Sequence, residues 1–121
     1  MEELSLFSQK VIHTVLKIPK GKVATYKQIA GLCGKPHASR GVAWILNSCS
    51  KKYKLPWQRV LNSRGRISFK PLTHNYRLQF MKLKTEGIKF APNGDIDMAK
   101  FQWSKKPRAE KWKRGQPKMF R

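Results

Sequence analysis

Acidic side chains are scarce in this sequence of 121 residues. It has 27 Lys and Arg against six Asp and Glu, a formal net charge of +21. Residues 4–85 hold 17 of the basic side chains and no carboxylate. This stretch therefore cannot supply the carboxylates of a metal-dependent nuclease, and its cations cannot be neutralised mainly by internal salt bridges. The charge favours a polyphosphate partner, and we expect a nucleic acid.

Cysteine is also scarce, and long apolar runs are missing. Cys33 and Cys49 form no Cys-x-x-Cys motif and no cluster with histidine, so we expect reduced thiols and no metal site. No apolar run has the length of a membrane span, and the N-terminus lacks a signal-peptide pattern. We expect a cytoplasmic, nucleoid-associated protein, or a nuclear one in a eukaryotic host, which acts as a monomer without a cofactor.

The apolar spacing predicts an N-terminal helix followed by a helix-turn-helix. Apolar residues recur at steps of three and four over residues 4–18. Thr25 with Gln28 three positions later is a capping box that opens a second helix, which Gly34 closes. A third helix is predicted over about residues 37–47, and a short glycine-containing turn between two helices is the helix-turn-helix pattern.

The rest of the chain is predicted to hold one more clear helix. Residues 48–54 are expected to form a basic loop, and residues 73–86 a helix capped by Thr73. Residues 104–121 carry eight Lys or Arg against one Glu, which is typical of a flexible basic tail. We therefore expect a DNA-binding domain over residues 1–103 and a tail over 104–121.

The stretch at residues 55–65 combines rigidity with a large aromatic side chain. Pro56 fixes one backbone angle and restrains the residue before it, so Trp57 follows a rigid elbow. Val60 and Leu61 can form a short strand, and Asn62 to Gly65 has turn chemistry. Arg66 to Phe69 would then return as the second strand of a β hairpin.

These residues resemble the active-site segment of the O6-alkylguanine-DNA alkyltransferases. There the segment reads Pro-Cys-His-Arg-Val, and the cysteine accepts the alkyl group. Here it reads Pro-Trp-Gln-Arg-Val, so Trp57 stands at the cysteine position and Gln58 at the histidine position. Tryptophan at that position is the mark of the alkyltransferase-like proteins. The resemblance covers about residues 7–103, and it implies a mainly α fold of winged-helix-like helix-turn-helix type with a short β hairpin.

The resemblance also implies roles for individual residues. Arg40 matches an arginine of the recognition helix that enters the minor groove and fills the place of a flipped nucleotide. Glu86 matches the glutamate that completes a Cys-His-Glu relay in true alkyltransferases. The lesion pocket would comprise Trp57, Tyr26, Lys70 and Pro56; the DNA-binding residues would include Thr25, Ser39, Gly41, Ala43, Arg64 and Arg66; and the loop support would comprise Arg59, Asn62 and Glu86.

Alkyl transfer needs a thiolate and a base that generates it. The indole of Trp57 is not a nucleophile, and the amide of Gln58 is not a base near neutral pH. The resemblance therefore implies a non-enzymatic protein that binds O6-alkylguanine in duplex DNA and flags it for nucleotide excision repair. The alternatives are a damage-independent helix-turn-helix or minor-groove binder, a basic RNA-binding protein, and an alkyltransferase that uses Cys33 or Cys49.

Overall fold

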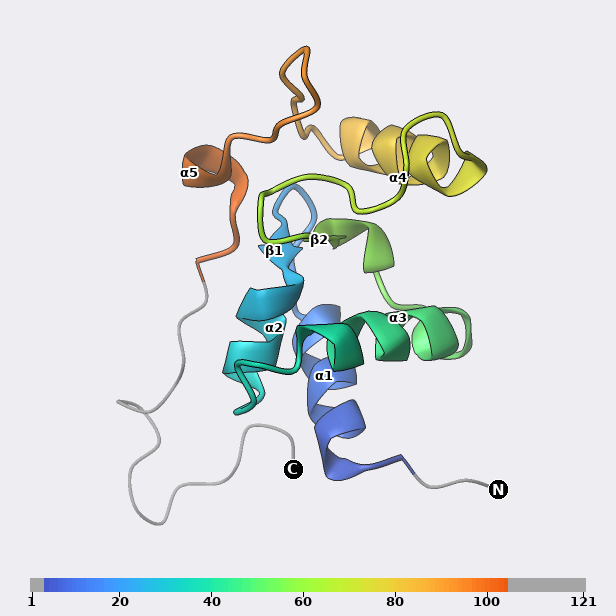
Figure 1. Cartoon of the computed structure of the whole chain (residues 1–121), viewed down its shortest axis with the longest axis vertical. Helices are drawn as coiled ribbons and strands as arrows, with labels where there is room; N and C mark the ends of the chain where they lie inside the picture. Colours follow the sequence, from blue (N-terminus) through green and yellow to red (C-terminus); the bar gives the residue numbers. More distant parts are fainter. Residues whose placement is uncertain (1–3, 105–121) are drawn as a thin grey trace.

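The computed structural model describes residues 4–104 and is mainly helical with one small sheet, as the sequence predicts (Figure 1). None of the helices within the described residues is long and apolar enough to cross a membrane. In chain order the elements are α1 (Leu6–Leu16), β1 (Ala24–Thr25), α2 (Tyr26–Leu32), α3 (Ser39–Tyr53), the 3-10 turn η1 (Trp57–Arg59), β2 (Val60–Leu61), α4 (His74–Thr85) and α5 (Met98–Phe101).

Helices α1, α2 and α3 pack together in the lower half of Figure 1. The predicted capping box is present: Thr25 Oγ1 accepts from Gln28 N at 3.0 Å, and Gln28 Oε1 accepts from Thr25 N at 3.3 Å. Two backbone groups at the start of α2 are thereby satisfied by side chains three residues apart. The helix-turn-helix prediction is confirmed, since α2 and α3 are consecutive packed helices joined by a short connection.

The two strands lie between two hydrophobic clusters. Ala24 and Val60 are buried in the cluster formed by α1, α2 and α3. Val23 and Leu61, next to them in the chain, are buried in a second cluster that includes Leu83 of α4. Successive side chains on an extended backbone point to opposite faces, so these short segments join the two halves of the core.

The strand pairing differs from the predicted hairpin. β2 pairs in parallel with β1, in the register Ala24 to Val60 and Thr25 to Leu61. The turn itself forms, since Asn62 N donates to Arg66 O at 3.0 Å. Residues 66–69 then form no strand, because Asn62 Oδ1 takes the Arg66 N–H at 3.1 Å and Gly65 O accepts from Ile96 N at 3.3 Å. The returning segment is held by these contacts rather than by an antiparallel ladder.

The predicted basic loop over residues 48–54 was wrong, because α3 continues to Tyr53. No Gly or Pro interrupts the chain between Val42 and Leu55, and Cys49 is buried on the inner face of the added turns. The helix ends where Lys54 adopts a left-handed conformation, with φ 55° and ψ 47°. The extension matters for the site, because it brings further residues of α3 alongside the Trp57 elbow.

Helix α4 covers the second cluster at the top of Figure 1. Thr73 caps it as predicted, with its side chain accepting from Tyr76 N. Tyr76 and Phe80 stack along one face, with ring centroids 6.3 Å apart. The short helix α5 lies in the stretch after α4, and its Phe101 belongs to the same cluster.

Candidate lesion-binding site

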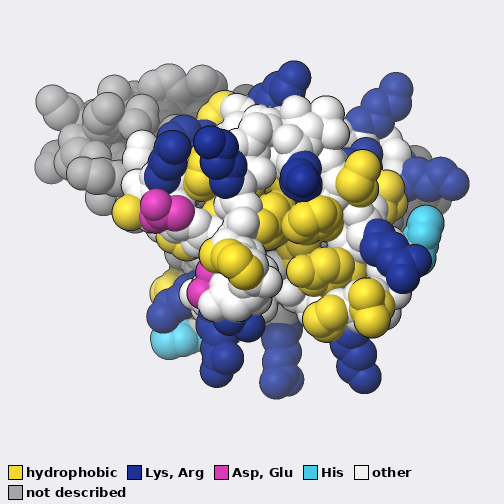
Figure 2. Space-filling view, turned by 90° about the horizontal axis from the view of Figure 1, so that it is seen from above, with side chains coloured by type: hydrophobic (Ala, Val, Ile, Leu, Met, Phe, Trp, Pro, Cys, Tyr) yellow, Lys and Arg dark blue, Asp and Glu magenta, His cyan; other side chains and the backbone are white. Residues whose placement is uncertain are grey.

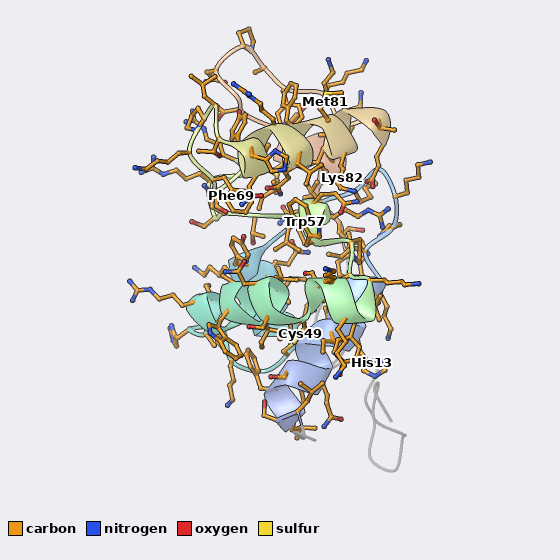
Figure 3. All side chains as sticks on the ribbon, turned by 90° about the vertical axis from the view of Figure 1, so that its right-hand side faces the viewer. His13, Cys49, Trp57, Phe69, Met81 and Lys82 are labelled. Carbon is orange, nitrogen blue, oxygen red and sulfur yellow. The ribbon has the colours of Figure 1, made fainter. Side chains whose placement is uncertain are left out.

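The elbow that carries Trp57 is built from local backbone geometry. Pro56 has φ −77° and ψ 64°, and Trp57 N donates to Leu55 O at 2.8 Å. These values define an inverse γ-turn, for which the ring of proline presets φ. Trp57 then begins the single 3-10 turn η1 and packs edge-on against Phe69, with centroids 6.4 Å apart. The indole is thus held at a definite place between α3 and α4 (Figure 3).

A cavity of about 510 Å³ opens beside Trp57. Its volume is within the range of cavities that bind small organic groups. Tyr26 lies at its edge, where its hydroxyl shares a 3.2 Å hydrogen bond with Ser68 Oγ. The walls of the cavity combine apolar and aromatic surface with polar and cationic groups. They are formed by Tyr26, Ala43, Leu46, Asn47, Ser50, Lys51, Lys54, Leu55, Trp57, Phe69 and Asn75.

Arg40 lies on the side of α3 that faces this cavity. Ala43, Asn47 and Lys51 line the cavity and follow one another at steps of four residues. Arg40 is three residues before Ala43, so it continues the same stripe into the first turn of the helix. Arg40 is exposed, so its side chain can contact a molecule bound over the opening of the cavity.

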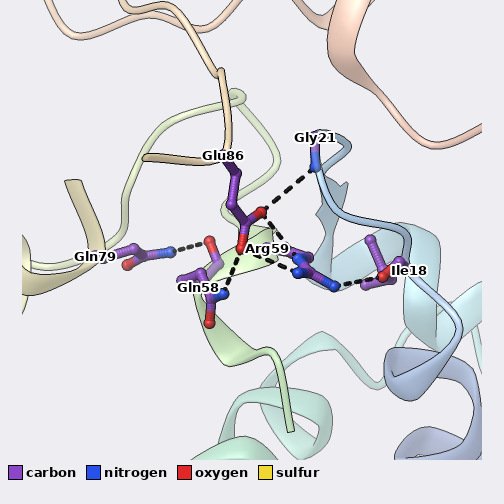
Figure 4. Close-up of polar contacts among 6 residues, drawn as sticks. All are labelled: Ile18, Gly21, Gln58, Arg59, Gln79 and Glu86. Carbon is purple, nitrogen blue, oxygen red and sulfur yellow. Dashed lines mark hydrogen bonds and ion pairs between the residues drawn. The ribbon is translucent and has the colours of Figure 1, made fainter. Parts of the chain in front are cut away.

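A largely buried ion pair fixes the elbow from behind (Figure 4). Arg59 Nε donates to Glu86 Oε1 at 2.9 Å, and Arg59 Nη2 donates to Glu86 Oε2 at 3.0 Å. Arg59 Nη1 also donates to Ile18 O at 2.8 Å, which ties η1 to the end of α1. Burial raises the pKa of Glu86, but the hydrogen bonds from Arg59 and Gln58 outweigh it and hold that pKa below its ordinary value.

Four of the residues expected at the DNA or the pocket are not among those that line the cavity. Thr25 is buried and caps α2, and its expected contact with DNA stays a prediction. Pro56 and Lys70 adjoin the cavity-lining residues Trp57 and Phe69 in the chain but do not line the cavity. Gly41 faces α1, where an added Cβ would lie 3.4 Å from Phe7 Cε2, so helix packing already explains its small size.

Arg64 and Arg66 line a separate hollow of about 230 Å³ with Asn62 and Phe69. Arg66 Nε forms an ion pair with Asp95, and both side chains remain nearly half exposed. Asn62 Oδ1 accepts from the backbone N–H groups of Arg64 and Arg66, which supports its expected part in shaping this loop. Ser39, the first residue of α3, is partly exposed.

Sequence reasoning missed several residues that form or support the site. Gln79 of α4 is buried, and its Nε2 donates to Gln58 O at 2.9 Å and to Val60 O at 3.1 Å. A polar residue on the apolar face of a predicted helix was the available signal for it. Phe69 and Asn75 reach the cavity through tertiary folding, which no local pattern indicates. Trp44 of α3 is 67% exposed.

The chemistry available in the described residues is limited. Cys33 and Cys49 are both free and buried, and burial raises the pKa of the Cys33 thiol. A buried thiol with a raised pKa is a poor nucleophile. Across residues 4–104 no three His, Cys, Asp or Glu side chains lie together in a way that would hold a metal ion. The cavity therefore offers surface, hydrogen bonds and positive charge.

Comparison with known proteins matches residues 6–88 to the family described as 6-O-methylguanine DNA methyltransferase, DNA binding domain. The chain belongs to this family, as an alkyltransferase-like member. It is 39% identical over 97 residues to the DNA base-flipping protein of Vibrio parahaemolyticus, covering 80% of this chain and 95% of that one. It is 38% identical over 82 residues to alkyltransferase-like protein 1 of Schizosaccharomyces pombe, covering 68% and 76%.

A solved structure supports the same fold for this alkyltransferase-like chain. S. pombe Atl1, in complex with damaged DNA containing O6-carboxymethylguanine, aligns with a TM-score of 0.73 at 30% identity. The alignment covers 86% of this chain and all of that one. The fold is thus that of an alkyltransferase-like DNA-binding domain.

Proposed function

We propose that this protein binds O6-alkylguanine in duplex DNA, flips the modified nucleotide into the Trp57 cavity, and leaves the alkyl group in place. The observation that carries the proposal is a cavity walled by Trp57 where a transferase would hold its reactive cysteine. An aromatic contact with a base contributes about 1–3 kcal/mol, which favours retention of an extrahelical base. The relatives named above as base-flipping and DNA-bound proteins support the same reading.

In this proposal the recognition helix α3 enters the minor groove, and Arg40 occupies the space that the flipped base vacates. Flipping costs a few kcal/mol of lost stacking and pairing. A planar guanidinium offsets this cost, because it can stack on a neighbouring base or donate to the orphaned partner. The position of Arg40, one helical turn from the cavity-lining Ala43, supports this part.

The consequence of binding would be a marked lesion. Without a cysteine thiolate among the residues that line the cavity, the alkyl group persists, so a later pathway must remove it. We propose that the bent, flipped complex hands the lesion to nucleotide excision repair proteins, and that a monomer suffices. A reconstituted incision assay tests this step: added protein should increase incision beside O6-methylguanine, and an unchanged rate would contradict it.

Competition binding on two duplexes that differ in a single O6-methylguanine tests the main proposal. It must be performed at near-physiological salt, because a protein of net charge +21 binds any DNA at low salt. We expect clear preference for the modified duplex. Equal binding would instead indicate a damage-independent helix-turn-helix protein, and a stable gain of one methyl group in protein mass would indicate alkyl transfer.

Two variants at one position isolate the role of Arg40. Arg40→Ala should reduce both the affinity and the preference for the modified duplex. Arg40→Lys keeps the charge and loses the planar guanidinium, so it should retain non-specific binding but lose preference. If Arg40→Lys behaves as the unchanged protein, Arg40 is a phosphate contact and not the residue that replaces the flipped base.

A further inference from the structure

The segment that joins the Trp57 elbow to α4 contains a tight turn with an unfavourable residue. Thr73 N donates to Lys70 O at 3.3 Å, so residues 70–73 form a turn with Pro71 at its second position. Leu72, at the third position, has φ +74°. Proline followed by a positive φ matches a type II turn, whose third position favours Gly or Asn because a Cβ is strained there.

Leu72 gains nothing within the protein that would offset this strain. Its side chain is 77% exposed. No other large hydrophobic side chain in the described part of the chain is as exposed. The other non-glycine residue with a positive φ in residues 4–104 is Lys54, which ends α3 and carries a soluble charged side chain. Leu72 ends no helix, and a leucine gains no burial free energy in water.

Leu72 lies, along the chain, midway between two residues that line the lesion cavity. Phe69, three residues before it, and Asn75, three residues after it, both line the cavity. A chain advances at most about 3.6 Å per residue, so the Cα of Leu72 lies within about 11 Å of the Cα of each. The residues from Lys70 to Asn75 are all exposed, so this turn projects from the protein beside the opening.

We propose that Leu72 is an apolar contact for the DNA at the rim of the cavity, where it packs on the sugar or base surface of the bound strand. The inference rests on the proposed function, because it requires DNA across the cavity mouth. The surroundings favour an anionic partner over a basic protein surface, because Lys70 and Arg77 flank the turn and no carboxylate occurs in residues 4–85. DNA is the anionic partner that the proposed function already places across the cavity. On the face seen from above, Figure 2 shows hydrophobic side chains with many Lys and Arg side chains around them and few Asp or Glu.

Apolar side chains placed against the minor groove are a known means of gripping a bent duplex. The strained turn holds the leucine outward in advance, so little conformational freedom is lost on binding. The backbone strain at Leu72 is a cost in the free protein, and contact of its side chain with DNA would offset that cost in the complex. Backbone strain of this kind is found mainly at functional sites.

The test compares Leu72→Asn with Leu6→Asn in the full chain. Asparagine has similar size, tolerates a positive φ and lacks the apolar surface. Leu6 is 60% exposed in α1, on the side of the molecule away from α4, and lines no part of the cavity. Affinity for the O6-methylguanine duplex and for its unmodified counterpart is measured at near-physiological salt, together with the melting temperature.

We expect Leu72→Asn to weaken binding of the modified duplex about 5-fold, from loss of roughly half a leucine's burial, and to leave the melting temperature equal or raised. Leu6→Asn should leave binding unchanged. Unchanged binding by Leu72→Asn, with lesion preference intact in the parent protein, would overturn this inference alone and point to a protein partner for Leu72. A lowered melting temperature would show that Leu72 is structural, which also overturns it, whereas loss of lesion preference in the parent protein would overturn the proposed function.

Discussion

Gln58 donates a hydrogen bond from Nε2 to Glu86 Oε2 at 2.8 Å, across the 28 residues that separate them in the chain. The orientation of the amide follows from chemistry, because an ionised carboxylate only accepts hydrogen bonds. Gln58 stands where the alkyltransferases have histidine, so the amide keeps the link to Glu86 while offering no base. The elbow is therefore tied to Glu86 by an amide, which cannot act as a base to activate a nucleophile.

Glu86→Gln should destabilise the protein. The substitution leaves the guanidinium of Arg59, whose side chain is 17% exposed, without its anionic partner. Removing one partner of a largely buried pair costs about 2–4 kcal/mol in the free energy of unfolding. Denaturant unfolding measures this loss. Asp95→Asn is the matched control, because the Arg66–Asp95 pair is nearly half exposed and its removal should change little. Equal effects of the two substitutions would contradict the assignment of Glu86 as the principal anchor.

The same carboxylate makes stability depend on pH. The pKa of Glu86 in the folded protein lies below its ordinary value of 4.5. A lowered pKa means that the folded state binds the proton less readily, so its contribution is complete above 4.5 and is lost as the pH falls through the lowered value. The stability difference between the parent protein and Glu86→Gln should therefore shrink on acidification from neutral pH. A constant difference would show that Glu86 does not titrate in this way.

Gly65→Ala should be costly at the turn that follows β2. Gly65 has φ +77°, and an added Cβ would lie 2.7 Å from Met98 Cγ. We expect a loss of about 1–3 kcal/mol in the free energy of unfolding from backbone strain and steric overlap. A second substitution, Met98→Ala, should recover only the part of the stability loss that comes from the steric overlap.

Gly31→Ala provides the opposite case. Gly31 lies within α2, and an added Cβ would meet no heavy atom within 4 Å. The substitution should therefore raise the free energy of unfolding by about 0.5–1 kcal/mol. If Gly65→Ala were neutral in thermal unfolding, the positive φ at that turn would not be required.

Gln79→Leu should loosen the elbow. Its side chain donates to two backbone carbonyls, at Gln58 and Val60, and leucine would leave both without this donor. Buried carbonyls that lose a partner cost about 1–3 kcal/mol. We expect lower stability and weaker lesion binding together. Gln9→Leu, which removes an exposed bond to Leu4 O, is the control and should alter neither. Weaker stability with unchanged lesion binding would separate Gln79 from the site.

Trp57→Ala should reduce binding of the O6-methylguanine duplex roughly 5- to 100-fold, the equivalent of one lost aromatic–base contact. Trp57→Phe should retain most of the affinity, because it keeps an aromatic face against the cavity. Binding of unmodified DNA should change much less in both variants. An equal loss on both duplexes would mean that Trp57 supports the fold and does not contact a flipped base.

The sequence by itself determined the features that depend on neighbours in the chain. Thr25 and Gln28 form their capping box within four residues, and Pro56 presets the elbow through its own ring. The replacement of a nucleophile by Trp57 was readable because it is a matter of residue identity. The expected roles of Arg40 and Lys70 at the DNA stay predictions.

Only the tertiary structure decided which distant segments meet. The parallel pairing of Ala24 with Val60 replaced the predicted hairpin, because burial between two hydrophobic clusters outweighs the short return through the Asn62 turn. The polar side chain of Gln79 donates a hydrogen bond to the elbow at Gln58 O. Helix α3 continues past its predicted end because no Gly or Pro lies between that end and Lys54. Such outcomes depend on contacts between residues tens of positions apart, whose free energy no local window of sequence contains.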